Sequence, residues 1–340
     1  MPKTPFDHGE NGLHVESESD LVQTYLAPLA AGMPGAFGLR DDAAVLPNEP
    51  GRDLVFSSDP IVAGVHFFVD DQPLDIAWKA LAVNVSDVTA KGAKPVAYML
   101  NLALPEAPKR TWMEDFARGL ADAQAAFGCR LIGGDTDRTP GPLSIGITMI
   151  ASLPSGTFVP RHAAKPGDHV FVTGTIGDAA LGLALRRDPS LFDAALTDVD
   201  RNFLLERYLR PRPRVALAES LRVHARAALD ISDGLLKDLA RLAEPGGMTL
   251  HFNAVPLSTP ARAALSVDRG MVDKILGGGG DYELLAAIAP SEVSAFQESA
   301  RRAGVEVHEL GVLAGSKVVV LDAAGTELKL AESGYDHFSR

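Results

Sequence analysis

Short blocks of apolar residues alternate with polar, glycine-containing blocks along this chain, and the pattern predicts strands interleaved with helices. Short apolar runs predict strands at residues 43–46, 54–57, 95–104, 129–132, 143–152, 169–173, 248–252, 282–289, 305–312 and 316–322. Helical spacing of apolar positions predicts helices at 19–30, 75–91, 111–127, 200–208, 213–224, 234–244 and 291–303, and an alanine-rich helix after residue 178. This alternation is typical of an α/β (α+β) fold.

Capping residues and a break in the pattern divide the chain further. Asp75 can cap the helix that stops at Gly92, and Thr111 with Glu114 forms a capping-box pattern for the helix that stops at Gly128. Residues 153–167 contain three prolines and two glycines, which is typical of a linker. We therefore expect two domains of similar size, at residues 15–153 and 154–340.

Composition narrows the class of protein. A chain of 340 residues with 46% hydrophobic and 22% charged residues has enough apolar surface for two packed cores. Its single cysteine excludes an internal disulfide framework, and no apolar run is long enough to cross a bilayer or to form a signal peptide, so we expect a cytoplasmic protein. A net charge of −12 argues against nucleic acid as a partner. The basic run at residues 210–214 is interpreted as a solvated helix entry, with contact to a phosphate or to RNA as the alternative.

Five short acidic motifs recur beside glycine or serine, each near a predicted strand end or helix edge. They are residues 38–42, 57–59, 86–87, 133–135 and 230–234, and they contain seven aspartates. Two carboxylates about 4 Å apart repel by about 4 kcal/mol at an effective dielectric of about 20. A converging cluster is therefore tolerable only if the acids are protonated, dispersed or holding cations, and Mg²⁺ with phosphates suits hard oxygen ligands. The recurrence predicts chemistry on a nucleotide.

Each motif also has an ordinary structural explanation. Asp41–Asp42 and Asp59–Pro60 are common turn sequences, and Asp87 with Lys91 could form an exposed i,i+4 ion pair. Residues 133–135 are harder to explain this way, because two glycines after an apolar strand allow a ligand to approach the backbone. The glycine run at 277–280 is either a substrate flap or a long turn.

Several common motifs are absent from the sequence. It contains no Gly-x-x-x-x-Gly-Lys-Ser/Thr loop, no dinucleotide-binding glycine fingerprint, no protein-kinase motif set and no zinc motif. A nucleotide would then be bound mainly through metal ions and backbone amides.

Taken in order, the motifs resemble the thiamine-monophosphate kinases of the aminoimidazole-ribonucleotide-synthetase-like superfamily. The segments that carry the resemblance are 41–45, 57–59, 62–67 (Val-Ala-Gly-Val-His-Phe), 79–87, 131–136, 165–168, 172–175, 230–234 and 334–338 (Gly-Tyr-Asp-His-Phe). They span nearly the whole chain.

The resemblance implies a fold, partners and site residues. It implies a two-domain fold whose N-terminal domain pairs strands across a homodimer, with the active site between the domains. It implies that ATP phosphorylates thiamine monophosphate by direct in-line transfer. The implied Mg²⁺ ligands are Asp42, Ser57, Ser58, Asp59, Asp87, Asp135, Asp230 and Asp233, of which Asp42, Asp135 and Asp230 are the expected catalytic residues. Gly134, Asp135, Arg161 and Ser232 would contact ATP, while His66 and Tyr335 would contact thiamine monophosphate.

One departure from the family pattern concerns acceptor recognition. The family reads Gly-Gly-Glu-Asp-Tyr-Glu-Leu or has an aspartate as its first acid, and Gly280 stands in that place here. Asp281, Glu283 or a shifted glycine loop could compensate for the missing contact. Two alternatives stay open: another ATP-using synthetase of the superfamily, and an inactive nucleotide-binding protein.

Overall fold

The chain forms two compact units. The computed structural model describes residues 14–47, 49–244, 246–330 and 334–335. Unit 1 comprises Met1–Val88 and Lys94–Gly156, and unit 2 comprises Thr89–Ala93 and Thr157–Arg340.

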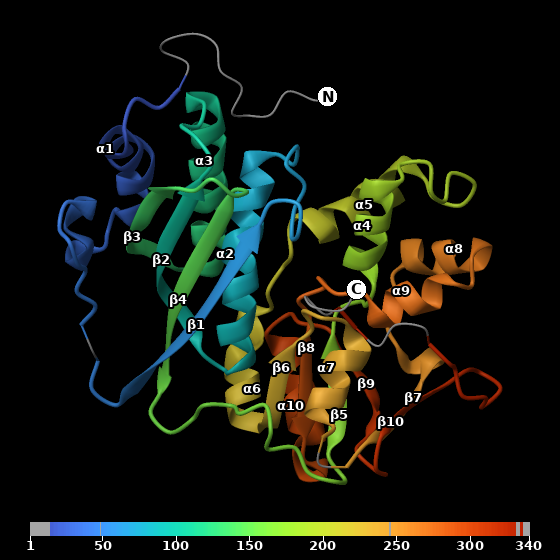
Figure 1. The fold of residues 1–340 in the computed structure, drawn as a ribbon. Coiled ribbons are helices and arrows are strands. Elements are labelled where there is room, and N and C mark those ends of the chain that lie inside the picture. Colours follow the sequence, from blue (N-terminus) through green and yellow to red (C-terminus); the bar gives the residue numbers. More distant parts are fainter. Residues whose placement is uncertain (1–13, 48, 245, 331–333, 336–340) are drawn as a thin grey trace. The chain divides into compact units, whose positions relative to one another are not determined.

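Unit 1 is built on a four-stranded sheet with the order β1-β4-β2-β3 (Figure 1). The strands are β1 (Arg52–Val62), β2 (Lys94–Leu104), β3 (Arg130–Arg138) and β4 (Ser144–Pro154). β4 is antiparallel to both β1 and β2, and β3 is parallel to β2. Such a mixed sheet leaves β1 and β3 as edge strands, where polar side chains can reach solvent.

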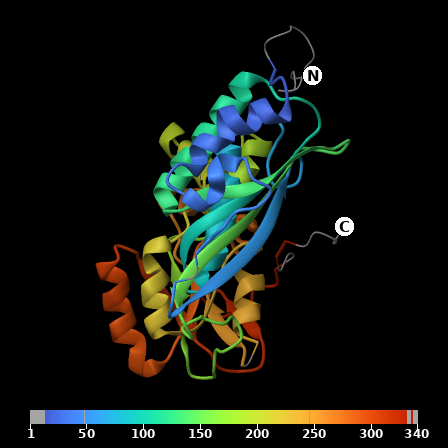
Figure 2. The same cartoon turned by 90° about the vertical axis from the view of Figure 1, so that its left-hand side faces the viewer.

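Helices α2 (Pro73–Ala90) and α3 (Arg110–Phe127) cover one face of this sheet (Figure 1). Ile145, Ile147 and Met149, alternate residues of β4, are fully buried. Ile150 has the opposite parity and packs with Ala30 and with other residues of the N-terminal segments. These segments, seen against the sheet in Figure 2, are α1 (Glu18–Leu21), η1 (Val22–Leu26), η2 (Ala27–Ala30) and η3 (Pro34–Leu39).

Unit 2 is a three-layer structure with helices on both faces of a second sheet. The antiparallel sheet has the order β6-β8-β5-β9, formed by β5 (His169–Thr173), β6 (Ala225–Asp230), β8 (Leu284–Ile288) and β9 (Val307–Val312), and a parallel pair joins β7 (Met248–His251) to β10 (Val318–Leu321). The helices are α4 (Asp178–Arg187), α5 (Asp198–Leu209), α6 (Ala218–His224), α7 (Leu235–Leu242), α8 (Thr259–Val267), α9 (Met271–Gly277) and α10 (Val293–Arg302), with short 3₁₀ turns η4 (Val215–Leu217), η5 (Phe252–Ala254) and η6 (Pro290–Glu292).

Strand alternation divides the core of unit 2 into two clusters. Val170 and Val172 of β5 belong to one cluster with residues of α4, α7, α8 and α9. Phe171, between them in sequence, packs in the other with Phe296 of α10 and Leu221 of α6. The single strand β5 is therefore buried on both faces, which explains its unbroken apolar sequence.

Several sequence-based boundaries were wrong, and each error has a structural cause. Residues 43–46 are not a strand. The Val45 N–H donates to the carbonyl of Gly35 (2.8 Å), which lies in the 3₁₀ segment η3 and not in a neighbouring strand. The acidic motif at 57–59 lies inside β1 and not at its end, since the ladder with β4 continues to Val62. Residues 133–135 likewise lie within β3.

Cap predictions had mixed outcomes. Gly92 and Gly128 follow α2 and α3 with φ values of 74° and 76°, which confirms both stops. The capping box at Thr111 was wrong, because α3 begins at Arg110 without a side-chain cap. Strand β6 and helices α8 and α9 were not predicted. Among the described residues, no helix has the length and hydropathy of a membrane span.

Candidate functional site

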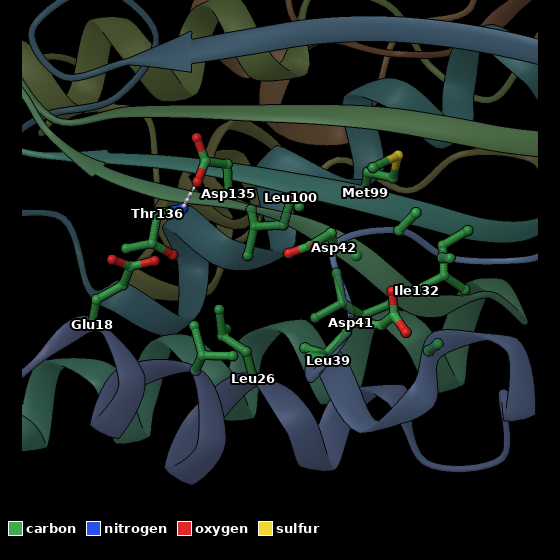
Figure 3. A pocket seen from close by; sticks show the side chains of 17 residues that line it. Glu18, Leu26, Leu39, Asp41, Asp42, Met99, Leu100, Ile132, Asp135 and Thr136 are labelled. Atoms are coloured by element: carbon green, nitrogen blue, oxygen red, sulfur yellow. Dashed lines mark hydrogen bonds between the residues drawn. The ribbon is translucent and has the colours of Figure 1, made fainter.

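In unit 1, acidic residues from two motifs line one pocket. Its volume is about 360 Å³, and it lies between β3 and the loop that follows η3 (Figure 3). Asp41 and Asp42 enter from that loop, while Asp135 and Gly134 come from β3. More of the pocket surface is polar than apolar, although most of the remaining lining residues have apolar side chains: Val22, Leu26, Ala36, Leu39, Ala43, Ala44, Met99, Leu100, Leu131 and Ile132, together with Glu18, Gly133 and Thr136. A mainly polar pocket edged by carboxylates suits an anionic ligand that carries a metal ion.

Local backbone conformation places these acids. Phe37 and Leu39 of η3 have positive φ values of 51° and 56°, which are uncommon for side-chain-bearing residues and turn the chain toward Asp41. On β3, the Thr136 N–H donates to a carboxylate oxygen of Asp135 (2.9 Å). Gly134 has a φ of 150°, and a Cβ there would lie 1.8 Å from the Leu100 carbonyl oxygen. This glycine is therefore required by the close approach of β2, whatever ligand it contacts.

The second pair of unit 1 motifs meets at the contact between β1 and α2. The Ser57 hydroxyl donates to Asp87 at 2.6 Å, so two predicted metal ligands lie side by side. Ser58 is exposed and hydrogen-bonds to Thr148. Lys91, the alternative partner considered for Asp87, donates its ammonium to the Ala228 carbonyl (2.7 Å).

Asn84 holds this region together, and the sequence reading assigned it no role. It is fully buried, its Oδ1 accepts from the Asp59 N–H (2.8 Å), and its Nδ2 donates to the Asp59 (3.2 Å) and Ala80 (3.1 Å) carbonyls. The side chain thereby binds the edge strand β1 to α2 at an acidic motif. A lone amide in the apolar run 80–85 was the signal that could have identified it.

In unit 2, the motif 230–234 forms the turn between β6 and α7. Asp230 is buried at the end of β6. The N–H groups of Ser232 and Asp233 both donate to Asp238 (3.1 and 3.0 Å), and burial raises the pKa of Asp238 to about 6. Asp238, which sequence reasoning missed, therefore holds the turn.

Asp233 already has cationic partners. Its carboxylate lies 3.0 Å from the Lys237 ammonium and 2.8 Å from the Arg241 guanidinium. The predicted acceptor residue Tyr335 lies here too: its N–H donates to the Asp233 carbonyl (2.8 Å), and Lys237 donates to its carbonyl. A metal-binding role for Asp233 would require these cations to be displaced. Asp336, His337 and Phe338 of the closing motif lie outside the described residues.

The glycine run at 277–280 packs directly on this turn and is not a free flap. The Gly280 N–H donates to the Ser232 carbonyl (3.0 Å) and the Tyr282 N–H to the Ile231 carbonyl (2.9 Å). A Cβ at Gly279 would lie 2.2 Å from the Ser232 carbonyl oxygen. The glycines thus allow close contact between two backbone segments.

Neither neighbouring acid compensates for Gly280, because both are buried in internal contacts. Asp281 accepts the N–H groups of Gly177 (2.7 Å) and Ala179 (3.0 Å) at the start of α4. Burial, with the charge of Asp178 second, raises the pKa of Asp281 to about 7.

Glu283 is occupied in the same way. It is fully buried and binds Arg207 (2.6 Å), Arg214 (2.7 Å) and the Thr173 hydroxyl (2.6 Å). The prediction that Arg214 belongs to a solvated basic run is therefore wrong for this residue.

The remaining predicted residues occupy separate places. His66 lies in the turn after β1, where its Nδ1 accepts from the Val62 N–H (3.0 Å). Arg161 is exposed in the loop after residue 157, with its Nε donating to His162 (3.4 Å). Within the described parts of the chain, no three His, Cys, Asp or Glu side chains are gathered closely enough to hold a metal ion.

Comparison with known proteins defines the class. The model of the AIR synthase related protein N-terminal domain matches residues 40–153, and that of the C-terminal domain matches residues 165–323. The fold and these two matches define a two-domain AIR synthase related protein.

Full-length relatives define the family more narrowly. Thiamine-monophosphate kinase of Caulobacter vibrioides is 40% identical over 326 residues, covering 94% of this chain and 91% of the relative. The crystal structure of thiamine-monophosphate kinase from Stenotrophomonas maltophilia is 38% identical, with a TM-score of 0.76 over 83% of this chain and 89% of that one. A structure of AaThiL complexed with AMPPCP and TMP is 28% identical, with a TM-score of 0.72 over 98% and 100%. The chain belongs to the thiamine-monophosphate kinase family.

Proposed function

We propose that this protein transfers the γ-phosphate of ATP to thiamine monophosphate, giving thiamine diphosphate and ADP. The observation that carries the proposal is the similarity, over nearly the whole of both chains, to a structure complexed with AMPPCP and TMP. The acidic pocket of unit 1, with Asp42 and Asp135 on facing segments, supports it.

The reaction requires little acid–base chemistry from the protein. An acceptor phosphate oxygen attacks the γ-phosphorus as the bond to the ADP oxygen breaks, and the acceptor is already an anion. The main barrier is repulsion between two polyanions, so catalysis consists of alignment and charge neutralisation. We propose that Gly134, Arg161 and Ser232 bind ATP, and that His66 and Tyr335 bind the acceptor.

The proposed metal ligands have suitable chemistry for Mg²⁺. All are hard oxygen donors: Asp42, Ser57, Ser58, Asp59, Asp87, Asp135, Asp230 and Asp233. Bound Mg²⁺ would neutralise phosphate charge. Ser57 donating to Asp87, and Asp42 lining the same pocket as Asp135, are the arrangements that support this set.

A coupled assay tests the function. Protein, ATP and Mg²⁺ should release ADP only when thiamine monophosphate is added, with thiamine diphosphate formed in equal amount. ADP release that depends on a different acceptor would favour a superfamily synthetase, and no ADP release with any acceptor would favour an inactive binding protein. Asp135→Asn should lower kcat at least 100-fold while the far-ultraviolet circular dichroism stays unchanged.

We further propose a homodimer in which unit 1 pairs with a second copy. β1 is an edge strand, and Phe56 on it is 62% exposed, an arrangement suited to strand or face pairing. Light scattering coupled to size exclusion should give twice the chain mass of 35.9 kDa. A single species at the monomer mass down to the lowest and up to the highest measurable concentration contradicts it.

A further inference from the structure

A buried group of three charged side chains supports the turn that carries His66. Lys79 and Asp75 lie on α2 and Asp71 just before it, and their exposed fractions are 6%, 8% and 7%. Burial lowers the pKa of Lys79 to about 7, while the charges of Asp71 and Asp75 oppose that shift. Placing charges inside a protein costs several kcal/mol per ion, so such a group is weak evidence for a purely stabilising role.

Two hydrogen bonds from this group hold the backbone of residues 62–72, here called the His66 loop, and one of them comes from within the loop. The Lys79 ammonium donates to the His66 carbonyl (3.3 Å), and the Asp71 carboxylate accepts from the Phe68 N–H (2.8 Å). Phe67, between these points, is 3% exposed. The backbone on both sides of Phe67 is therefore hydrogen-bonded to charged groups, one on α2 and one near the end of the loop itself.

A second contact determines what the His66 ring can do. Because the Val62 N–H donates to Nδ1, that nitrogen carries a lone pair and the ring proton is on Nε2. This bond holds the imidazole ring against the end of β1.

We propose that Lys79 is a positioning residue for acceptor recognition, since its hydrogen bond to the His66 carbonyl holds the loop that carries this proposed acceptor-binding residue. This inference rests on the proposed function, in which the acceptor is thiamine monophosphate. Lys79 acts through the loop and has no need to touch either substrate.

Steady-state kinetics of Lys79→Met test the proposal, because methionine keeps most of the stem volume and removes the ammonium. We expect the KM for thiamine monophosphate to rise at least tenfold while the KM for ATP changes less than twofold. Asp71→Asn removes a charge from the same group at nearly constant volume and should change the same KM in the same direction. It replaces Lys79→Met if that variant is recovered unfolded.

A double-mutant cycle with His66→Ala separates positioning from general stability. If Lys79 acts through His66, adding Lys79→Met to the His66→Ala variant should raise the KM for thiamine monophosphate less than twofold further. Full additivity, or equal rises in both KM values, overturns the proposal.

Arg201→Met is the matched control. Arg201 also donates to main-chain carbonyls, those of Pro189 (2.7 Å) and Leu191 (3.1 Å), on a loop of unit 2 that holds none of the proposed site residues. Its loss should lower stability with both KM values unchanged. Failure of the proposed function is a distinct result, since the unaltered protein would then show no ADP release dependent on thiamine monophosphate.

Discussion

Replacing Asn84 with alanine should loosen the edge strand of unit 1 at its acidic motif. Asn84→Ala removes one hydrogen bond accepted from the Asp59 N–H and two donated to the Asp59 and Ala80 carbonyls. A buried hydrogen bond contributes about 1 kcal/mol net, so the three together predict a loss of about 3 kcal/mol, with a further cost for the cavity.

Tryptophan fluorescence can follow this loss in unit 1. The chain has two tryptophans, Trp78 and Trp112, and both lie in unit 1. Urea titrations monitored at this signal should therefore report unfolding of unit 1 separately from unit 2. The half-saturating Mg²⁺ concentration of the kinase assay should also rise, because Asp59 is a proposed metal ligand.

Asn84→Asp is the informative companion variant. It keeps the shape and the acceptor for the Asp59 N–H, but it turns a donor into an acceptor that faces two carbonyls. It should therefore be less stable than Asn84→Ala at neutral pH. The reasoning is refuted if Asn84→Ala loses less than 1 kcal/mol, or if Asn84→Asp is as stable as the unaltered protein.

Three further predictions concern unit 2 and the pocket of unit 1. Gly279→Ala should destabilise unit 2 by about 1–3 kcal/mol and raise the KM for ATP, because its Cβ would collide with Ser232. Gly146→Ala is the control, since a Cβ there meets only ordinary contacts and should be tolerated. Equal denaturation midpoints for the two variants would contradict this prediction. Burial raises the pKa of Asp281 from 3.8 to about 7. This shift contributes stability that is fully present below pH 3.8 and is lost as pH rises through 7, so the free energy of unfolding should fall by about 4 kcal/mol over that range. Asp281→Asn should therefore flatten the pH dependence of unfolding between pH 4 and 7, and an unchanged slope would count against it. Gly134→Ala should abolish activity and destabilise unit 1, because its Cβ would lie 1.8 Å from the Leu100 carbonyl oxygen. A fully active variant would contradict this, since it would mean that β2 can move away from the added methyl group.

Much of the architecture could be predicted from local patterns. The strands at 95–104 and 143–152 appear as β2 and β4 with boundaries shifted by one or two residues. Gly92 and Gly128 end helices in the left-handed conformation because glycine adopts it without steric cost. Strand β6 was missed, since an alanine-rich run such as 225–230 becomes a strand only by pairing with β8.

The sequence by itself determined the family, the alternation of elements and the acidic motifs, because these depend on residue type and short-range spacing. Tertiary structure decided which acids are engaged inside the protein. Glu283 meets Thr173 and Arg214, 110 and 69 residues away in the chain, and Asp281 meets the start of α4. Both looked like spare acids beside Gly280, yet burial and long-range partners commit them to the scaffold. A carboxylate's role depends on its desolvation and on the charges around it, and only the folded chain brings those together.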